Sequence, residues 1–510
     1  MSQFICDDRT VVFTKEGKLQ GFALDSTCIF RGIRYATAKR FQRPQRLAPW
    51  DGVKPALHYG TISPTSYVEN HESDILIPHR EWMQAEDCQY LNVWTQNLDT
   101  KAKLPVMVWI HGGGYYMGSS IELETFDGAR LSRYGDVVVV SINHRLNILG
   151  YLDLKEHTDR FPDSANAGTA DIVESLRWVH DNIAAFGGDP DNVTIFGQSG
   201  GGHKVSSIMQ IPEADGLYSK CIMMSGITPN FRYPRRGENG KQIVDALLAE
   251  LGMKANEAER LAETPYRELS AAHVKAQEAL RKQWVYCGET PLPDDFYQGD
   301  WQEVGFRPEC KDVAVMVGTV IAEFAFGITL PGKHKMTVDE QMVLLRDKFG
   351  EQTSALIEAY RKAYPEKPIV DLLAFESSIR TQGQRFCSAR IKAADAPAYN
   401  YVFAQEFPID GGRLAWHCAD IPFAFHNVEL SPVANMGRES EILQDKMCGA
   451  WTSFARTGKP VLPGGPEWKP YTEAGHETMI FDTPCRLGVN FDDALLRLHD
   501  AAVPTTVFQP

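Results

Sequence analysis

Ser199 stands in the motif Gly197-Gln-Ser-Gly-Gly201, between an apolar segment and a helical one, where a serine can serve as a nucleophile. A hydroxyl attacks a carbonyl carbon only when it is exposed and a neighbouring base takes its proton. The tight turn that exposes it leaves almost no room for side chains, and glycine occupies positions 197 and 200–202. The same pattern also occurs by chance as an ordinary glycine-rich turn, so its surroundings must decide.

A second glycine-rich segment, His111-Gly-Gly-Gly-Tyr115, follows another apolar run. Backbone N–H groups stabilise the oxyanion of acyl transfer if no side chain keeps the oxygen away, and consecutive glycines after a strand are typical of such an oxyanion loop. A flexible turn or a phosphate loop is the alternative, but no Lys-Ser or Lys-Thr pair follows at P-loop spacing.

The segments that must position these groups are apolar runs alternating with helical or looped sequence, which predicts an α/β fold with a large, mostly parallel central sheet. Strands are expected at residues 90–95, 104–111, 137–143, 193–198, 220–225, 313–318, 399–404 and 478–482. The runs at 90–95, 104–111 and 137–143 are too continuously apolar for half-exposed strands, so the sheet should be covered on both faces. Residues 170–186 carry apolar side chains at helical spacing and should pack on it.

Residues 17–24 and 29–36 are expected to form short edge strands. The polar, proline-containing stretch 59–84 is long enough to be a functional loop over the site. Two charged helical stretches, 230–307 and 335–394, are expected as cap-like excursions over the C-terminal edge of the sheet. We therefore expect the whole chain, 1–510, to form one domain.

The net charge of −14 argues against nucleic acid as a partner, because phosphates require clustered Lys and Arg. No apolar run approaches the ~18 residues of a membrane span. The first residues lack the basic and apolar regions of a signal peptide, so we expect a cytoplasmic protein, acting as a monomer or homodimer. The ten cysteines are scattered singly, as expected for free thiols rather than for a disulfide framework or a zinc site.

Over residues 11–482 the sequence resembles the type-B carboxylesterases, which include bacterial esterases and cholinesterases. The matching segments are Phe30-Arg-Gly-Ile-Arg-Tyr-Ala, Glu86-Asp-Cys-Gln-Tyr-Leu-Asn-Val-Trp, Trp109-Ile-His-Gly-Gly-Gly-Tyr, Asn143-His-Arg-Leu, Asn182-Ile-Ala-Ala-Phe-Gly-Gly-Asp-Pro, Val193-Thr-Ile-Phe-Gly-Gln-Ser, Trp416-His-Cys-Ala-Asp-Ile-Pro-Phe and Phe454-Ala-Arg-Thr-Gly-Lys-Pro. The resemblance implies an α/β-hydrolase fold and a serine carboxylesterase that needs no metal or cofactor. Its substrate would be a small-molecule ester.

His417 is the expected base, because it alone of the histidines lies in a segment similar to the family's histidine segment. His203 is a rival by proximity in sequence, but a helix would carry it away from Ser199. The resemblance places the acid at Glu323, after an expected strand, although Val320 and Phe324 stand where the family usually has Asn and Gly. Asp312 and Glu309 remain alternatives.

By resemblance the oxyanion donors are Gly113, Gly114 and Gly200. Gln198 stands where the family commonly has Glu, and Arg34 where it commonly has Pro, which puts substrate preference in doubt rather than reaction class. Amides, carbamates and thioesters are alternative substrates of the same machinery. A non-catalytic adhesion or interaction module is the alternative from a different class, and it would require a lost nucleophile or base.

Overall fold

The computed structural model of the protein describes residues 3–65, 75–228, 239–281, 285 and 287–503. Its centre is a 12-stranded sheet. In spatial order the strands are β1 (Phe4–Ile5), β4 (Phe22–Leu24), β5 (Thr27–Arg34), β9 (Tyr90–Thr95), β11 (Val138–Ile142), β10 (Leu104–Ile110), β12 (Gly188–Gln198), β13 (Lys220–Met224), β14 (Ala314–Val320), β15 (Ala398–Phe403), β18 (Thr478–Phe481) and β19 (Arg486–Gly488). All neighbours from β11 to β18 are parallel, so their carboxyl ends lie along one edge. The expected strands of the central sheet are thereby confirmed.

The N-terminal strands differ from the expectation. The outermost strand is β1, which pairs antiparallel with β4, so β4 and β5 are second and third rather than at the edge. The remaining short strands form three small sheets: β2 (Val11–Phe13), β3 (Lys18–Gln20) and β8 (Val53–Pro55); β6 (Ala36–Thr37) and β7 (Gln45–Arg46); and β16 (Glu406–Phe407) and β17 (Arg413–Leu414).

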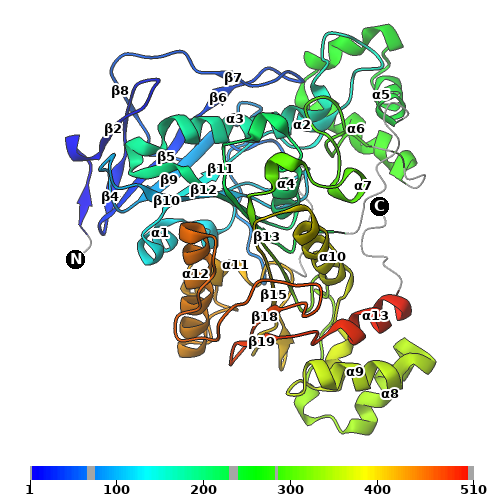
Figure 1. Ribbon diagram of the computed structural model, residues 1–510. Helices are drawn as coiled ribbons and strands as arrows, with labels where there is room; N and C mark the ends of the chain where they lie inside the picture. The colour runs from blue at the N-terminus through cyan, green and yellow to red at the C-terminus, as the bar shows by residue number, and fades with distance from the viewer. Residues whose placement is uncertain (1–2, 66–74, 229–238, 282–284, 286, 504–510) are drawn as a thin grey trace.

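Helices cover both faces of the central sheet (Figure 1). They are α1 (Ala129–Gly135), α2 (Asn147–Tyr151), α3 (Ala167–Asn182), α4 (Gly200–Ile208), α5 (Asn239–Glu250), α6 (Tyr266–Arg281), α7 (Trp301–Val304), α8 (Val338–Phe349), α9 (Thr353–Ala363), α10 (Ser378–Ala393), α11 (Ile421–Ala424), α12 (Arg438–Thr457) and α13 (Asp493–Ala502). In Figure 1, α3 lies above the strands, and α1 and α12 lie below them. Within the described ranges, none of these helices is long and apolar enough to cross a bilayer.

Strand β10 shows why the sheet is buried on both sides. Successive side chains of a strand point to opposite faces. Met107 and Trp109 therefore join the core cluster that contains Trp451 of α12, whereas Val106 and Val108 join the cluster that contains Ile172 of α3. Every residue of β10 is buried, so its apolar run reflects two buried faces rather than one.

The two charged stretches fold into α5 to α7 and α8 to α10, while residues 230–238, 282–284 and 286 of the first lie outside the described residues. Helix α10 packs on the sheet itself, because its Phe386 and Cys387 share a core cluster with Val315 and Val317 of β14. That the chain forms one domain with these stretches as a cap remains a prediction.

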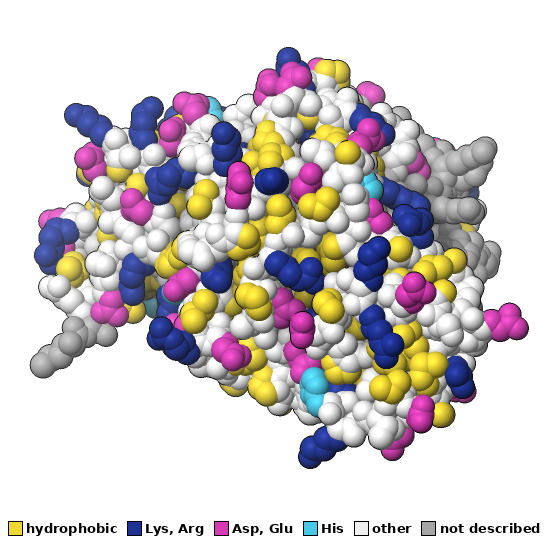
Figure 2. Space-filling view, turned by 60° about the horizontal axis from the view of Figure 1, so that its bottom comes forward, with side chains coloured by type: hydrophobic (Ala, Val, Ile, Leu, Met, Phe, Trp, Pro, Cys, Tyr) yellow, Lys and Arg dark blue, Asp and Glu magenta, His cyan; other side chains and the backbone are white. Residues whose placement is uncertain are grey.

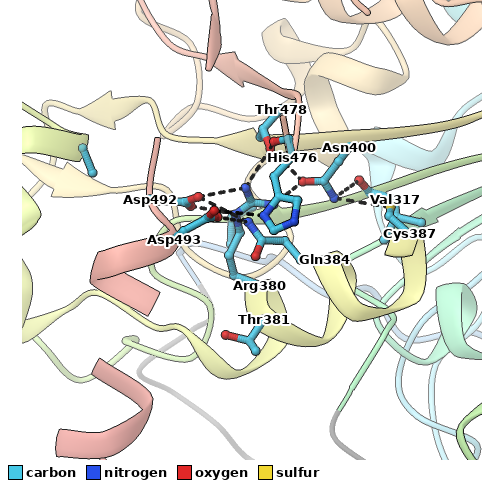
Figure 3. Close-up of polar contacts among 12 residues, drawn as sticks. Val317, Arg380, Thr381, Gln384, Cys387, Asn400, His476, Thr478, Asp492 and Asp493 are labelled. Carbon is cyan, nitrogen blue, oxygen red and sulfur yellow. Dashed lines mark hydrogen bonds and ion pairs between the residues drawn. The ribbon is translucent and has the colours of Figure 1, made fainter. Parts of the chain in front are cut away.

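A buried arginine ties the C-terminal elements to the sheet (Figure 3). Arg380 of α10 donates from Nε to Asp492 Oδ2 at 2.9 Å, from Nη2 to Thr478 Oγ1 at 2.9 Å, and from Nη1 to Asn400 Oδ1. Asn400 of β15 in turn donates to the Val317 carbonyl of β14 at 3.0 Å. The guanidinium thus joins α10, β15, β18 and the residue before α13, and its charge is paired where burial would otherwise be costly.

Charged side chains are scattered over one face of the molecule (Figure 2). On the face shown in Figure 2, Lys and Arg side chains lie interspersed with Asp and Glu instead of gathering in one patch. All ten cysteines are free, as expected, and Cys88 is buried.

Candidate active site

Ser199 forms the turn between β12 and α4. Its backbone has φ 57° and ψ −128°, a conformation that side-chain-bearing residues rarely adopt. The Ser199 N–H donates to the Met224 carbonyl of β13 at 2.8 Å, which fixes the turn against the neighbouring strand. Ser199 is half-buried, at the carboxyl-end edge of the parallel strands. A strained serine at this edge matches the geometry of a nucleophile elbow.

Glycines let the expected oxyanion loop approach this turn. A Cβ at Gly200 would lie 2.4 Å from the Cα of Gly114, and a Cβ at Gly201 would lie 2.0 Å from the Ile110 carbonyl oxygen. Real Cβ atoms essentially never come so close, so only glycine fits at both positions. Gly113 and Gly114 have φ of 79° and 61°. The structure thus brings Gly200 and the 112–114 loop together.

Glu323 and His417 meet although 94 residues separate them in sequence. Glu323 Oε2 accepts a hydrogen bond from His417 Nδ1 at 2.6 Å, and the Glu323 carboxylate is fully buried. The Val320 N–H donates to its other oxygen at 3.0 Å. The two loops are held together by their backbones as well, since the His417 N–H donates to the Glu323 carbonyl at 2.7 Å. With Nδ1 as the donor, Nε2 of the neutral ring is left as the acceptor.

The rival residues lie elsewhere. Asp312 precedes β14 and Glu309 pairs with Arg307 at 3.4 Å, both at the amino end of the strand whose carboxyl end leads to Glu323. Seven strand residues span roughly 23 Å, so neither carboxylate reaches the histidine from there. His203 is carried away by α4, as expected, and its Nε2 lies 3.7 Å from Asp300.

Gln198, the residue before Ser199, contacts the His417 ring. Its Nε2 lies 3.2 Å from His417 Nε2, and its Oε1 accepts a hydrogen bond from the Cys418 thiol at 3.2 Å. Among the described residues, the Ser199 hydroxyl makes no hydrogen bond to His417. Hydrogen bonds of this kind commonly form only when substrate binds. In the structure, His417 Nε2 instead faces the side-chain amide of Gln198.

Two neighbours of this cluster had not been assigned roles. The Phe324 ring lies over the His417 ring, 4.4 Å between centroids. Asp420 is fully buried and accepts a hydrogen bond from the Tyr401 hydroxyl at 2.8 Å. Burial raises the pKa of Asp420 to about 7, opposed by Tyr401 and assisted by the negative charge of Glu323. An aspartate in an apolar segment three residues after the expected base was the available signal.

Three basic residues that precede His111 in the sequence, Arg34, His79 and Arg80, each lie beside a carboxylate. Arg34 binds Asp87 and Tyr90, His79 Nδ1 lies 3.3 Å from Glu122, and Arg80 pairs with Glu124. The charges of Arg34 and Arg80 are therefore offset by nearby anions, and these two residues add little net positive charge. Of the expected loop over the site, residues 66–74 lie outside the described part of the chain.

The sequence of this chain is similar to those of known esterases. The sequence model of the Carboxylesterase family matches residues 8–494. The para-nitrobenzyl esterase of Bacillus subtilis (strain 168) is 30% identical over 491 residues, covering 93% of this chain and 95% of that protein. Liver carboxylesterase B-1 of Rattus norvegicus is 31% identical over 519 residues, 91% of this chain and 88% of that protein.

A solved structure is similar over nearly the full length. It is an esterase from anaerobic Clostridium hathewayi, described as able to hydrolyze aliphatic aromatic polyesters. The TM-score is 0.95 at 48% sequence identity, with 99% of this chain and 100% of that chain covered.

Proposed function

This chain belongs to the carboxylesterase family and is a carboxylic ester hydrolase, and we propose that Ser199, His417 and Glu323 carry out the reaction. The observation that supports this assignment most directly is the 2.6 Å hydrogen bond from His417 Nδ1 to the buried Glu323 carboxylate. It leaves Nε2 unprotonated and able to accept a proton from a serine.

In the proposed mechanism, Ser199 Oγ bonds to the ester carbonyl carbon while its proton passes to His417 Nε2. The N–H groups of Gly113, Gly114 and Gly200 stabilise the oxyanion, and collapse of the intermediate expels the alcohol, which takes the proton from His417. Water then attacks the acyl-enzyme by the same steps, and the acid leaves. Before the first attack, the Gln198 amide must move away from His417 Nε2, so that this nitrogen can accept the proton of Ser199.

The assignment is tested by hydrolysis of p-nitrophenyl esters of graded acyl length, together with labelling by a fluorophosphonate and peptide mapping. We expect turnover of the esters and one label per chain, on Ser199. A label on another residue, with Ser199 unmodified, would overturn the assignment. An anilide, a carbamate and a thioester of the best acyl group test the alternative bonds.

Aliphatic aromatic polyesters are a second substrate class to include, because the esterase described as hydrolysing them is 48% identical to this chain. Release of aromatic acid from a polyester film by the wild type, and not by the protein after labelling of Ser199, is the expected outcome. We also propose that the protein acts in the cytoplasm, which its ten free cysteines support, and that it is a monomer or homodimer.

We expect a preference for neutral esters over choline esters. Gln198 is uncharged, and Trp82 donates to the Ile121 carbonyl and packs its ring on Tyr59, so neither provides an obvious site for a quaternary ammonium. The measurement is kcat/KM for butyrylcholine against its neutral isostere 3,3-dimethylbutyl butyrate, at two salt concentrations.

Gln198→Glu is the matched variant for this comparison. A carboxylate beside the reacting carbonyl should raise the relative kcat/KM of the cation roughly tenfold, less at high salt. Since a carboxylate also favours the imidazolium form of His417, both proteins are compared at a pH above the acidic limb of their profiles. A wild type that already prefers the cation would show that another group supplies the choline site.

A further inference from the structure

Helix α4, which begins immediately after Ser199, carries a lysine inside the protein. Lys204 is 1% exposed, and among the ion pairs of the described residues it has no carboxylate partner. Burial lowers the pKa of Lys204 to about 7, although the charge of Glu122 opposes the shift. A buried ammonium without a close anion costs stability, so packing alone does not account for it.

The ammonium contacts the backbone just before the oxyanion glycines. Lys204 Nζ donates to the carbonyl oxygen of His111 at 3.1 Å. Among the described residues we find no second donor to this carbonyl. Without the lysine, a buried acceptor at the start of the 112–114 loop would lose its partner.

The same helix also contacts the residue just after the glycines. Lys204 Nζ lies 5.7 Å from the centre of the Tyr115 ring, within the range of a cation–π contact. One turn further along α4, the Ser207 hydroxyl shares a hydrogen bond of 2.9 Å with the Tyr115 hydroxyl. Helix α4 therefore holds the oxyanion loop on both sides of its glycines.

The glycines need such external support. Without side chains, Gly112 to Gly114 can adopt many backbone conformations, and only some of them aim N–H groups at a developing oxyanion. Gly200 packs against Gly114 from the side of Ser199, and the Met117 N–H donates to the Gly113 carbonyl at 3.1 Å, so the middle of the loop has contacts of its own. The contacts at His111 and Tyr115 restrict the two ends.

We propose that Lys204 is a positioning residue for the oxyanion hole, holding the His111 carbonyl and the Tyr115 ring so that the loop between them keeps its catalytic conformation. The proposal rests on the proposed function, because it assumes that this loop stabilises the oxyanion. Lys204 acts through the loop and does not itself contact substrate.

Lys204→Met tests the proposal, since methionine fills similar space without charge or a donor. We expect kcat per active site to fall about 10- to 100-fold, because small displacements of oxyanion donors are costly, while KM changes less than about threefold. An aryl trifluoromethyl ketone is the second readout. Ser199 Oγ adds to its carbonyl carbon, the proton passes to His417, and the resulting oxyanion occupies the hole. Its Ki should rise by the same factor as kcat/KM falls.

Lys220→Met is the matched control. Lys220 is also mostly buried, at 8% exposed, and its Nζ donates to Asn192 Oδ1 at 2.6 Å and to Ser219 Oγ at 2.9 Å. It begins β13, whereas Met224 at the other end of that strand bonds to Ser199. Its replacement should lower the unfolding midpoint and leave kcat and Ki unchanged.

A folded Lys204→Met enzyme with wild-type kcat and Ki would overturn the proposal. If Lys204→Met does not fold, the same measurements are made on Lys204→Leu and Lys204→Gln. Failure of all three to fold would assign Lys204 to folding rather than to the hole. Failure of the proposed mechanism would give a different result, because the wild type would then hydrolyse esters even after Ser199 is replaced or labelled.

Discussion

Replacing Ser199 with alanine should lower kcat for a p-nitrophenyl ester by about 10⁴- to 10⁶-fold while leaving the fold intact. The hydroxyl is the proposed nucleophile, and without it only the oxyanion hole and substrate binding remain to accelerate hydrolysis by water. The folded state should lose little, because Ser199 is half-buried and its main-chain hydrogen bond to Met224 does not involve the side chain.

Ser206→Ala is the control for this variant. Ser206 lies in the same helix, and its hydroxyl donates to the His203 carbonyl within that helix at 2.8 Å, so its loss should leave kcat within about twofold. Circular dichroism and thermal unfolding check both proteins. Retention of more than a tenth of the wild-type kcat by purified Ser199→Ala would refute its role as the nucleophile.

Replacing Glu323 with glutamine should cost roughly 10³- to 10⁴-fold in kcat. The amide has one oxygen and one NH₂ group, and the Val320 N–H already needs an acceptor from this side chain. If the NH₂ group faces His417, Nδ1 becomes the acceptor and Nε2 carries the proton, so the ring can no longer accept one from Ser199. The buried, charge-assisted bond is lost as well.

Asp312→Asn provides the comparison, because it changes the nearest rival carboxylate at the other end of β14. Its kcat should stay close to that of the wild type, with both variants assayed at the pH optimum after their folding is checked. A larger loss in Asp312→Asn than in Glu323→Gln would move the acid to another residue.

The turns and strands that form the candidate site were predictable from the sequence. The glycines around Ser199 and after His111 indicated two tight turns, and the structure shows why at Gly200 and Gly201, where any Cβ would collide with backbone atoms. The apolar runs likewise predicted the strands that carry these turns, because a strand covered on both faces needs apolar residues at every position, as in β10. Each of these signals can be read from one short segment, although the close approach that requires glycine at 200 and 201 is to Gly114 and Ile110 of another segment.

The contacts between distant segments were decided by the tertiary structure. The residue before Ser199 touches His417 across 219 positions, and Lys204 reaches the His111 carbonyl across 93. Glu323 rather than Asp312 lies against His417, because the carboxyl end of β14 faces the histidine loop. Arg34 and Arg80 likewise pair with Asp87 and Glu124. No local pattern encodes these pairings, because they depend on the spatial order of the parallel strands, whose carboxyl ends lie along one edge of the sheet.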